Sequence, residues 1–462
     1  MQREMKSISE QITHVYFVGI GGIGMSALAR YFKANGYQVA GYDRTPSDLT
    51  KELDEKEHIA VTYRDAEDAI GVEYRDKANT LVVYTPAVPK DNKLLLFFEK
   101  EGFVLYKRSE VLGWLSEKGK ALCIAGTHGK TTTSTLLAYL LYNSSVGCNA
   151  FLGGISMNFG TNLLLDISSP YIVVEADEFD RSFLRLTPEI AAITAMDEDH
   201  LDIYGNRENL VAAFEEFACK VRKGGKVFLK EGLNLRKSKV SGYYGVETPV
   251  DCYSDRLRID GVYSVFDYHG MKAEIKDLRL GVPGRMNVEN ATLAITLALE
   301  VGVKPEEIKE ALPGFRGVLR RFNIHTSGQV IYVDDYAHHP REIEAVLGAI
   351  REVWPEKKLT VAFQPHLYSR TADLHDWFAR SLNMADEVIL LDIYPARELP
   401  MPGVTSELIR KDVTKPSTVL TKEEFFNFVE EHVKEGVFVT LGAGDIDRFV
   451  PMLSEFFRKE RN

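Results

Sequence analysis

One lysine of this chain stands where a bound phosphate would need a cation. An apolar run ends at Ala125 and is followed by a loop and a helix start with the residues Gly126, Thr127, His128, Gly129, Lys130, Thr131 and Thr132. Backbone N–H groups of such a loop can surround nucleotide phosphates, the lysine can neutralise oxygens near the transferred phosphoryl group, and the hydroxyl of Thr131 can hold Mg²⁺. The first glycine of the strict pattern GxxxxGK[ST] would fall at Ile124, so the match is incomplete. A capped helix with an exposed lysine is the structural alternative.

Acidic residues follow two apolar runs beyond this loop. They are Glu175, Asp177 and Glu178 in "YIVVEADEFDRSFL", and Asp197, Asp199, His200 and Asp202 in "ITAMDEDHLDIYG". The carboxyl ends of parallel strands face one ligand crevice, so we expect these side chains on the same edge as Lys130. Magnesium prefers oxygen ligands and keeps several waters and substrate phosphates, so one carboxylate with a histidine or a water-mediated contact is sufficient. Solvated acidic loops are the alternative.

A second glycine-rich turn lies near the N-terminus. Gly19, Gly21 and Gly24 fit GxGxxG between an apolar strand and a helix, and Asp43 follows the next strand. This pattern is typical of a dinucleotide site, with a pyrophosphate at the helix N-terminus and the acid on a ribose hydroxyl. A purely structural strand-to-helix turn would also require glycine. The spacing leaves open which diphosphate binds.

Length and composition limit the classes of protein to which this chain can belong. The 462 residues suggest about three domains. The net charge of −11 argues against general nucleic-acid binding, which needs a basic surface. The four cysteines have no CxxC spacing and are expected to be buried free thiols: Cys123, Cys148, Cys219 and Cys252. A polar N-terminus and the lack of any apolar run near eighteen residues predict a cytoplasmic protein without membrane insertion.

The elements that position these residues form three blocks in which apolar strands alternate with amphipathic helices. Such alternation predicts parallel sheets covered by helices. We expect domains at residues 1–118, 119–318 and 319–462, and an antiparallel excursion between Val240 and Gly281, where polar and apolar residues alternate.

Taken together, the motifs resemble those of the Mur ligases. The shared stretches, in order, are "GIGGIGMSALA", "AGTHGKTTT", "VVEADEFDRSF", "DEDHLDIYG", "RRFN", "VDDYAHHPREI", "FQPHLYSRT", "YPARELPMPGVTS" and "LGAGDID". The resemblance covers all three blocks and implies an α/β fold with a Rossmann-like N-terminal domain, a central P-loop ATPase-like domain and a C-terminal Rossmann-like domain. It also implies a member that uses ATP and Mg²⁺ to join L-alanine to the lactyl carboxylate of UDP-N-acetylmuramate through an acyl phosphate, in peptidoglycan precursor synthesis.

The same resemblance assigns roles to individual residues. For the UDP-sugar diphosphate it implies Gly19, Gly21, Gly22, Gly24 and Asp43. For ATP it implies the loop from Gly126 to Thr132 together with Asn290, Arg321 and Asp335. Lys130, Glu175 and His200 would be catalytic, and Thr131, Glu175 and His200 would lie at the metal. Tyr336, His338 and Arg370 would bind the amino acid.

Three features depart from the family pattern. Met286 stands where a histidine is expected, and Leu367 stands where many members have arginine, so that one anion contact is missing or supplied elsewhere. Some relatives carry a carbamylated lysine near the metal; we expect a plain carboxylate here, from Glu215 or Glu216.

Other functions fit parts of the pattern. A recycling ligase that attaches L-alanyl-γ-D-glutamyl-meso-diaminopimelate to the same UDP-sugar would share most motifs. From other classes, the first turn alone fits an NAD-dependent dehydrogenase, and the second fits a non-catalytic nucleotide switch. We expect a monomer or weak homodimer.

Overall fold

The first sheet has five parallel strands in the order β3-β2-β1-β4-β5. They are β1 (His14–Val18), β2 (Gln38–Tyr42), β3 (Ala60–Thr62), β4 (Thr80–Tyr84) and β5 (Leu105–Lys107). Successive residues of β1 enter different cores: Val15 and Phe17 pack with helices α2 (Ile23–Ala34), α3 (Asp48–Glu55) and α5 (Arg108–Lys118), whereas Tyr16 and Val18 pack with α4 (Lys93–Lys100). The order reverses beside β1, which places a ligand crevice at the carboxyl end of that strand, where the first glycine turn begins.

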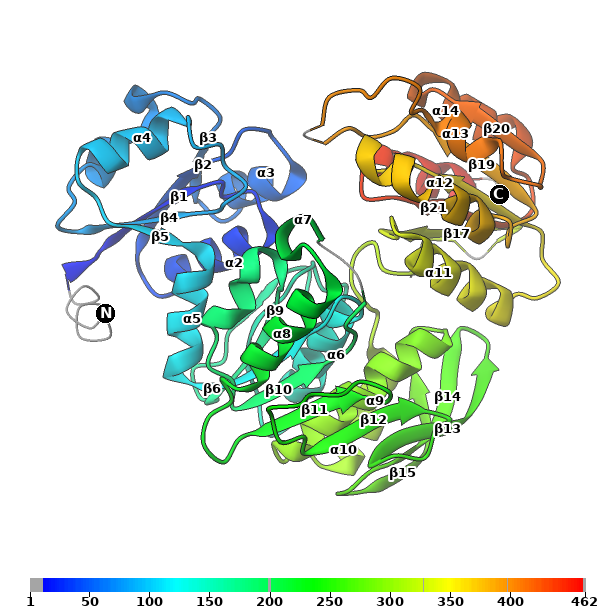
Figure 1. The fold of residues 1–462 in the computed structure, drawn as a ribbon, viewed down its shortest axis with the longest axis horizontal. Helices are drawn as coiled ribbons and strands as arrows, with labels where there is room; N and C mark the ends of the chain where they lie inside the picture. The colour runs from blue at the N-terminus through cyan, green and yellow to red at the C-terminus, as the bar shows by residue number, and fades with distance from the viewer. Residues whose placement is uncertain (1–10, 198–200, 327, 397, 460–462) are drawn as a thin grey trace. The chain divides into compact units, whose positions relative to one another are not determined.

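The computed structural model describes residues 11–197, 201–326, 328–396 and 398–459 (Figure 1). The chain divides into two units: Met1–Asp255, Tyr268–Ile275 and Asn290–Ala311 form the first, and Arg256–Asp267, Lys276–Glu289 and Leu312–Asn462 form the second. The core of the first sheet continues into residues of the second sheet, such as Cys123 and Val174, within the first unit.

The second sheet runs in the order β15-β14-β13-β12-β11-β10-β6-β9-β7-β8. Its strands are β6 (Lys120–Ala125), β7 (Asn149–Phe151), β8 (Leu163–Leu164), β9 (Tyr171–Ala176), β10 (Ile190–Ile193), β11 (Lys226–Lys230), β12 (Gly242–Val246), β13 (Cys252–Asp260), β14 (Tyr263–His269) and β15 (Glu274–Leu280). Its helices are α6 (Lys130–Tyr142), α7 (Leu201–Tyr204), α8 (Arg207–Ala218), α9 (Arg285–Glu300) and α10 (Pro305–Ala311). In the centre, β6 pairs in parallel with β9 and β10, and Ala125 is level with both Ala176 and Ile193. Three strands therefore end together at one edge.

The predicted antiparallel excursion begins later than expected. β12 pairs in parallel with both β11 and β13, so the segment near Val240 continues the parallel sheet. Only two residues join β13 to its neighbour β14, a link that permits antiparallel pairing alone.

The third sheet has the order β16-β17-β21-β18-β19-β20 and is parallel except for β16. Its strands are β16 (Asn323–Ile324), β17 (Val330–Asp335), β18 (Leu359–Phe363), β19 (Glu387–Leu391), β20 (Ser417–Leu420) and β21 (Gly436–Leu441). The helices of this part are α11 (Pro340–Val353), α12 (Tyr368–Leu382), α13 (Ser406–Arg410), α14 (Lys422–His432) and α15 (Val450–Lys459). The predicted α/β class with three sheet-containing parts is confirmed.

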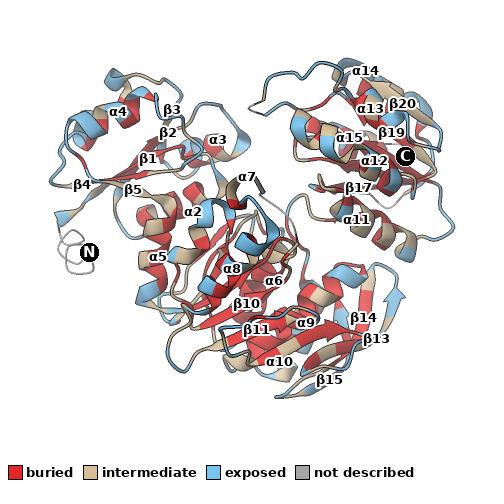
Figure 2. Cartoon of the chain, in the orientation of Figure 1, coloured by how far each residue is buried: buried red, intermediate tan, exposed pale blue. Residues whose placement is uncertain are grey.

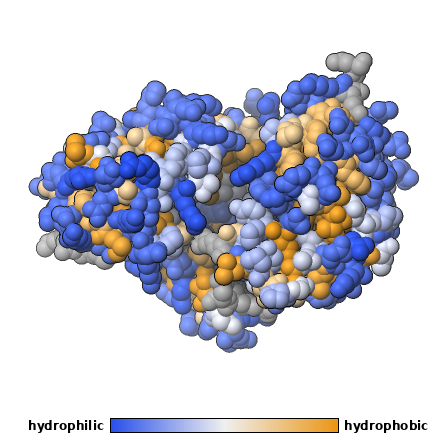
Figure 3. Space-filling view, turned by 90° about the horizontal axis from the view of Figure 1, so that it is seen from above, coloured by the Kyte–Doolittle hydropathy of each residue, from blue (hydrophilic) through white to orange (hydrophobic). Residues whose placement is uncertain are grey.

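Burial follows this layering (Figure 2). The sheet strands are mostly buried, and the helices are buried on the side that meets a sheet. Three cysteines are buried as expected, but Cys219 is exposed, because it follows the last turn of α8. Among the described helices none is long and apolar enough to cross a membrane, and the face drawn in Figure 3 is largely hydrophilic with scattered apolar residues.

Candidate active site

The P-loop around Lys130 lies where β6, β9 and β10 end. Gly126 and Gly129 have φ of 131° and 82°, in the left-handed region that favours glycine. Gly129 directly precedes α6, so Lys130, Thr131 and Thr132 form its first turn, where the helix dipole favours an anion. The predicted loop-to-helix arrangement is therefore present.

Residues that directly follow β10 hold this loop in shape. The hydroxyl of Thr194 contacts the carbonyl oxygens of Ala125, at 3.1 Å, and of His128. A Cβ added at Gly126 would lie 2.1 Å from that hydroxyl, so the close approach requires glycine. The N–H of Asp197 donates to the hydroxyl of Thr127 at 3.1 Å.

Lys130 is held by a carboxylate and a carbonyl. Its Nζ lies 2.6 Å from the carbonyl oxygen of Gly126 and 2.9 and 2.8 Å from Oε1 and Oε2 of Glu178. Glu178 is completely buried. Burial alone would lower the pKa of Lys130, but the negative charges of Glu178, Glu175 and Asp177 outweigh that effect and raise it. These carboxylates therefore favour the ammonium form of Lys130.

The acids predicted for this edge have different partners. Asp177 accepts hydrogen bonds from the Phe179 N–H, at 3.0 Å, and from Arg108, at 3.4 Å. Asp197 lies 3.7 Å from Nε2 of His128. Glu175 is close enough for its charge to act on Lys130. The candidate ligand His200, like Asp199, lies outside the described residues.

The oxygen donors near Lys130 suit Mg²⁺. Thr131 offers a hydroxyl in the first turn of α6 and Glu175 offers a carboxylate at the end of β9. The described residues contain no group of three or more His, Cys, Asp or Glu side chains that could hold a metal by themselves. A magnesium ion here would depend on phosphate oxygens and waters, as is common for this ion.

The first glycine turn is fixed by Asp43. The N–H of Gly21 donates to Oδ2 of Asp43 at 2.7 Å, and the N–H of Thr45 donates to Oδ1 at 3.2 Å. Gly19 has φ of 90°, and Gly22 precedes the first residue of α2. Asp43 thus positions the turn, a role that the sequence pattern did not predict.

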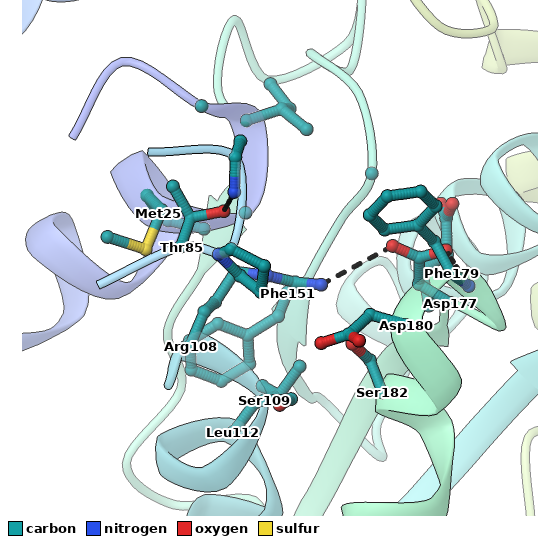
Figure 4. A pocket seen from close by; sticks show the side chains of 18 of the residues that line it. Met25, Thr85, Arg108, Ser109, Leu112, Phe151, Asp177, Phe179, Asp180 and Ser182 are labelled. Atoms are coloured by element: carbon teal, nitrogen blue, oxygen red, sulfur yellow. Dashed lines mark hydrogen bonds and ion pairs between the residues drawn. The ribbon is translucent and has the colours of Figure 1, made fainter. Parts of the chain in front are cut away.

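A cavity of about 290 Å³ opens beside this turn (Figure 4). It is lined by the start of α2, by Arg108 and Ser109 of α5, and by residues at the end of β9. Arg108 extends across it toward Asp177 in Figure 4, and a Cβ at Gly24 would lie 2.8 Å from Nη1 of Arg108. The cavity thus connects the first glycine turn with the acidic segment that holds Lys130.

Asn290 lies in α9 of the first unit, and the remaining predicted residues lie in the second unit and form their own cluster. The ring of Tyr336 lies 5.4 and 5.3 Å from the guanidinium carbons of Arg320 and Arg321, and 5.3 Å from the ring of His338. Nη1 of Arg370 is buried and has no hydrogen-bond partner in the described part of the chain. An unpaired, buried guanidinium N–H is costly, which points to a ligand that would accept from it.

Burial shifts the pKa values of two titratable groups in this cluster. It raises the pKa of Asp335 to about 6, against the attraction of Arg321 and hydrogen bonds from the N–H groups of Ala337 and Phe322. Burial lowers the pKa of His338, partly offset by Glu342.

Comparison with known proteins places this geometry in a family. Three family models match successive segments: "Mur ligase family, catalytic domain" at residues 14–120, "Mur ligase middle domain" at 124–298, and "Mur ligase, glutamate ligase domain" at 320–444. The chain belongs to the Mur ligases. It is similar to the UDP-N-acetylmuramate–L-alanine ligase of Phocaeicola vulgatus, with 49% identity over 453 residues that cover 96% of this chain and 98% of that protein.

Solved Mur ligase structures share the fold. The UDP-N-acetylmuramate-alanine ligase of Thermotoga maritima has a TM-score of 0.82 and 29% identity, over 97% of this chain and 99% of that one. A murein peptide ligase of Psychrobacter arcticus has a TM-score of 0.68 and 21% identity, over 96% and 98%.

Two residues that depart from the Mur ligase pattern, Met286 and Leu367, each lie at the start of a helix. Met286 is the second residue of α9 and is 38% exposed. Leu367 precedes α12 with φ of 72°, and its N–H donates to the carbonyl of Tyr394 at 3.0 Å. An aliphatic side chain at position 367 offers no contact to an anion.

The expectation of a metal-site carboxylate on α8 does not fit the observed contacts. Both carboxylate oxygens of Glu215 accept backbone N–H groups, from Arg236 and from Lys237, the latter at 3.0 Å. Glu216 is exposed and pairs with Arg181 at 3.2 Å. Glu215 therefore holds the loop at Arg236 and Lys237, and Glu216 forms a surface ion pair.

Sequence reasoning missed several residues of this Mur ligase site. Glu178 is one of several acids in its segment, and nothing in the sequence singles it out. Thr194 follows a strand and belongs to no recognisable motif, and Arg108 lies in the stretch "KRSE", which has no characteristic pattern. The run of acids after β9 was the available signal for Glu178, but it did not say which acid faces Lys130.

Proposed function

We propose that this chain uses ATP to join L-alanine to the lactyl carboxylate of UDP-N-acetylmuramate. The relatives named for that reaction support the proposal, because one of them is 49% identical over nearly the whole of both chains. The observation that carries it in the chain itself is the shared segment at the end of β9: one side lines the cavity by the first glycine turn, and the other holds the P-loop lysine. An acceptor and a nucleotide bound at these two places would be neighbours.

The first glycine turn is proposed to bind the acceptor's diphosphate. Gly19, Gly21, Gly22 and Gly24 allow close backbone approach, and the N-terminus of α2 favours an anion. Asp43 would act by orienting the Gly21 N–H, to which it is bonded at 2.7 Å. The absence of a Cβ at Gly24 leaves room for Arg108 beside the cavity.

The P-loop is proposed to bind ATP and carry the first step. Loop N–H groups from Gly126 to Gly129 would hold phosphates, and Lys130 would neutralise charge on the γ-phosphoryl group as the lactyl carboxylate oxygen attacks phosphorus and ADP leaves. Asn290, Arg321 and Asp335 are proposed as further nucleotide contacts. Thr131 and Glu175, with His200, would hold Mg²⁺, which supplies positive charge that screens the two anions from each other.

The second step is proposed to use the cluster in the second unit. The amine of L-alanine attacks the acyl carbon, a tetrahedral intermediate forms, and inorganic phosphate leaves while the amine loses its protons to solvent. Arg370 would hold the alanine carboxylate, since its planar guanidinium suits bidentate recognition. Tyr336 and His338 would complete the pocket. The reaction is proposed to occur in the cytoplasm.

Phosphate release tests the proposal. We expect release that depends on UDP-N-acetylmuramate, ATP and L-alanine together, and none of comparable rate with L-alanyl-γ-D-glutamyl-meso-diaminopimelate as the amine. Preference for the tripeptide would favour the recycling ligase. A nicotinamide-dependent absorbance change without phosphate release would favour a dehydrogenase, and tight ATP binding without acceptor-dependent turnover would favour a nucleotide switch.

A further inference from the structure

Glu178 neutralises the ammonium group of Lys130. An ammonium group has three N–H donors. Nζ of Lys130 donates hydrogen bonds to the carbonyl oxygen of Gly126, at 2.6 Å, and to Oε1 of Glu178, at 2.9 Å, and it forms an ion pair with Oε2 of Glu178 at 2.8 Å. Two of its donors and its positive charge are therefore already engaged, and a phosphate that binds Lys130 competes with the Glu178 carboxylate for them. Glu178 weakens the attraction of Lys130 for a nucleotide, because the carboxylate and the phosphates are both anions.

The segment that carries Glu178 also borders the cavity. Glu175, Asp177 and Phe179 line the cavity, whereas Glu178 is completely buried and pairs with Lys130. Asp177 is bonded to Arg108, which crosses the cavity (Figure 4). A molecule that enters the cavity thus meets residues on both sides of Glu178 in the sequence.

The backbone after Glu178 is held under strain. Asp180 and Arg181 have φ of 52° and 54°, a left-handed conformation that costs free energy in residues other than glycine. The Glu178 carbonyl oxygen accepts the hydroxyl of Tyr204 at 2.6 Å and the N–H of Arg181 at 3.0 Å. Strain of this kind persists only where surrounding contacts impose it, and it is relieved when those contacts change.

We propose that Glu178 is a positioning residue that couples the two sites. While the cavity is empty, its carboxylate holds Lys130 away from the nucleotide; when the UDP-sugar contacts Asp177 and Phe179, the segment moves and the ammonium becomes available to phosphate. The inference rests on the proposed function, which supplies the two ligands. Coupling between equilibrium binding sites is reciprocal, so the nucleotide tightens UDP-sugar binding by the same factor.

Calorimetric titration of Mg·ADP, with and without saturating UDP-N-acetylmuramate, tests this coupling. In the wild-type protein we expect the UDP-sugar to lower the Kd of ADP by about fivefold or more, the lower range of typical coupling. In Glu178→Gln, which keeps the shape but not the charge, we expect ADP alone to bind about as tightly as it does to the wild-type complex. The effect of the UDP-sugar should then fall below about twofold.

The controls separate this inference from the proposed function. Glu216→Gln removes an exposed carboxylate of the same type, which pairs with Arg181 at 3.2 Å, and should leave the coupling unchanged. If the wild-type protein binds both ligands but without coupling, or if Glu178→Gln keeps the wild-type ratio or weakens ADP binding in both states, the inference is wrong and the function stands. If the wild-type protein binds neither ligand, both the inference and the proposed function fail.

A second variant is used if Glu178→Gln does not unfold cooperatively. Glu178→Asp retains the charge with a shorter side chain and should show a smaller change in the same direction. An unchanged ratio of the two Kd values in that variant overturns the inference.

Discussion

The hydroxyl of Thr133 donates a hydrogen bond of 3.1 Å to Oδ1 of Asn290, and both side chains are buried. Thr133 is in the first turns of α6 and Asn290 is in α9, 157 residues later. The same amide oxygen lies 2.7 Å from the place where a Cβ on Gly129 would be. A distant segment of the chain therefore completes the wall of the P-loop.

Gly129→Ala should weaken nucleotide binding and stability through this contact. Alanine at φ of 82° has a conformational cost of about 1 kcal/mol, and its Cβ would also push against Asn290. Gly232→Ala is a matched control, because Gly232 has φ of 79° but nothing within 4 Å of the added atom. We expect urea unfolding to show a larger loss for Gly129→Ala than for Gly232→Ala, and only the former to raise the Kd of ADP. Equal effects of the two variants would show that the contact with Asn290 is unimportant.

The pair of Lys130 and Glu178 should show strong thermodynamic coupling. Removing one partner of a buried ion pair leaves an uncompensated charge, at a cost of about 3–5 kcal/mol. We therefore expect Lys130→Met to lower the free energy of unfolding by an amount of that order, and Lys130→Met/Glu178→Gln to recover most of it. Ligation should fall by at least about 10²-fold in both, because neither has the cation. Additive effects on the free energy of unfolding would contradict the pairing, and wild-type ligation by a folded Lys130→Met protein would contradict the proposed role.

The sequence identified the strand ends of this site but not the partners within it. Glycine spacing predicts both turns because only glycine adopts the φ of Gly126 and Gly19, and parallel strands must end on one side. Which of Glu175 and Glu178 meets Lys130 depends on how β9 is rotated against α6, a property of packing. The same limit applies to Glu215, whose carboxylate binds backbone N–H groups of a loop about twenty residues later. The sequence shows that Leu367 replaces the arginine of many Mur ligases, whereas its positive φ is visible only in the structure.

Acid should destabilise the protein through two histidines of the second unit. Burial, with nearby positive charge, lowers the pKa of His325 and of His366 to about 4, from about 6.5 when unfolded. Between pH 6.5 and 4 the unfolded state therefore binds more protons than the folded state, so stability falls as pH falls through that window and is full above it. His325→Phe keeps a ring that can stack on Tyr332, which lies 5.1 Å away, but cannot titrate. For His325→Phe we expect the slope of the unfolding free energy against pH to be smaller in this window, by the contribution of up to about one bound proton. An unchanged slope would contradict the pKa assigned to His325.

Replacement of Arg370 should separate amino-acid binding from nucleotide binding. Nη1 of Arg370 is buried without a hydrogen-bond partner in the described part of the chain, and Leu367, one turn earlier, supplies no cation. With a single guanidinium available at these two positions, Arg370→Ala should raise the KM for L-alanine by at least about tenfold, as expected when a charge-assisted hydrogen bond worth about 1.5–3 kcal/mol is lost, while the KM for ATP changes little. Arg380→Ala is the matched control on the same helix, because Arg380 is exposed and pairs with Asp376. Arg370→Lys should recover part of the loss, since the charge returns without the bidentate fork. An equal rise in both KM values for Arg370→Ala would place Arg370 outside the amino-acid pocket.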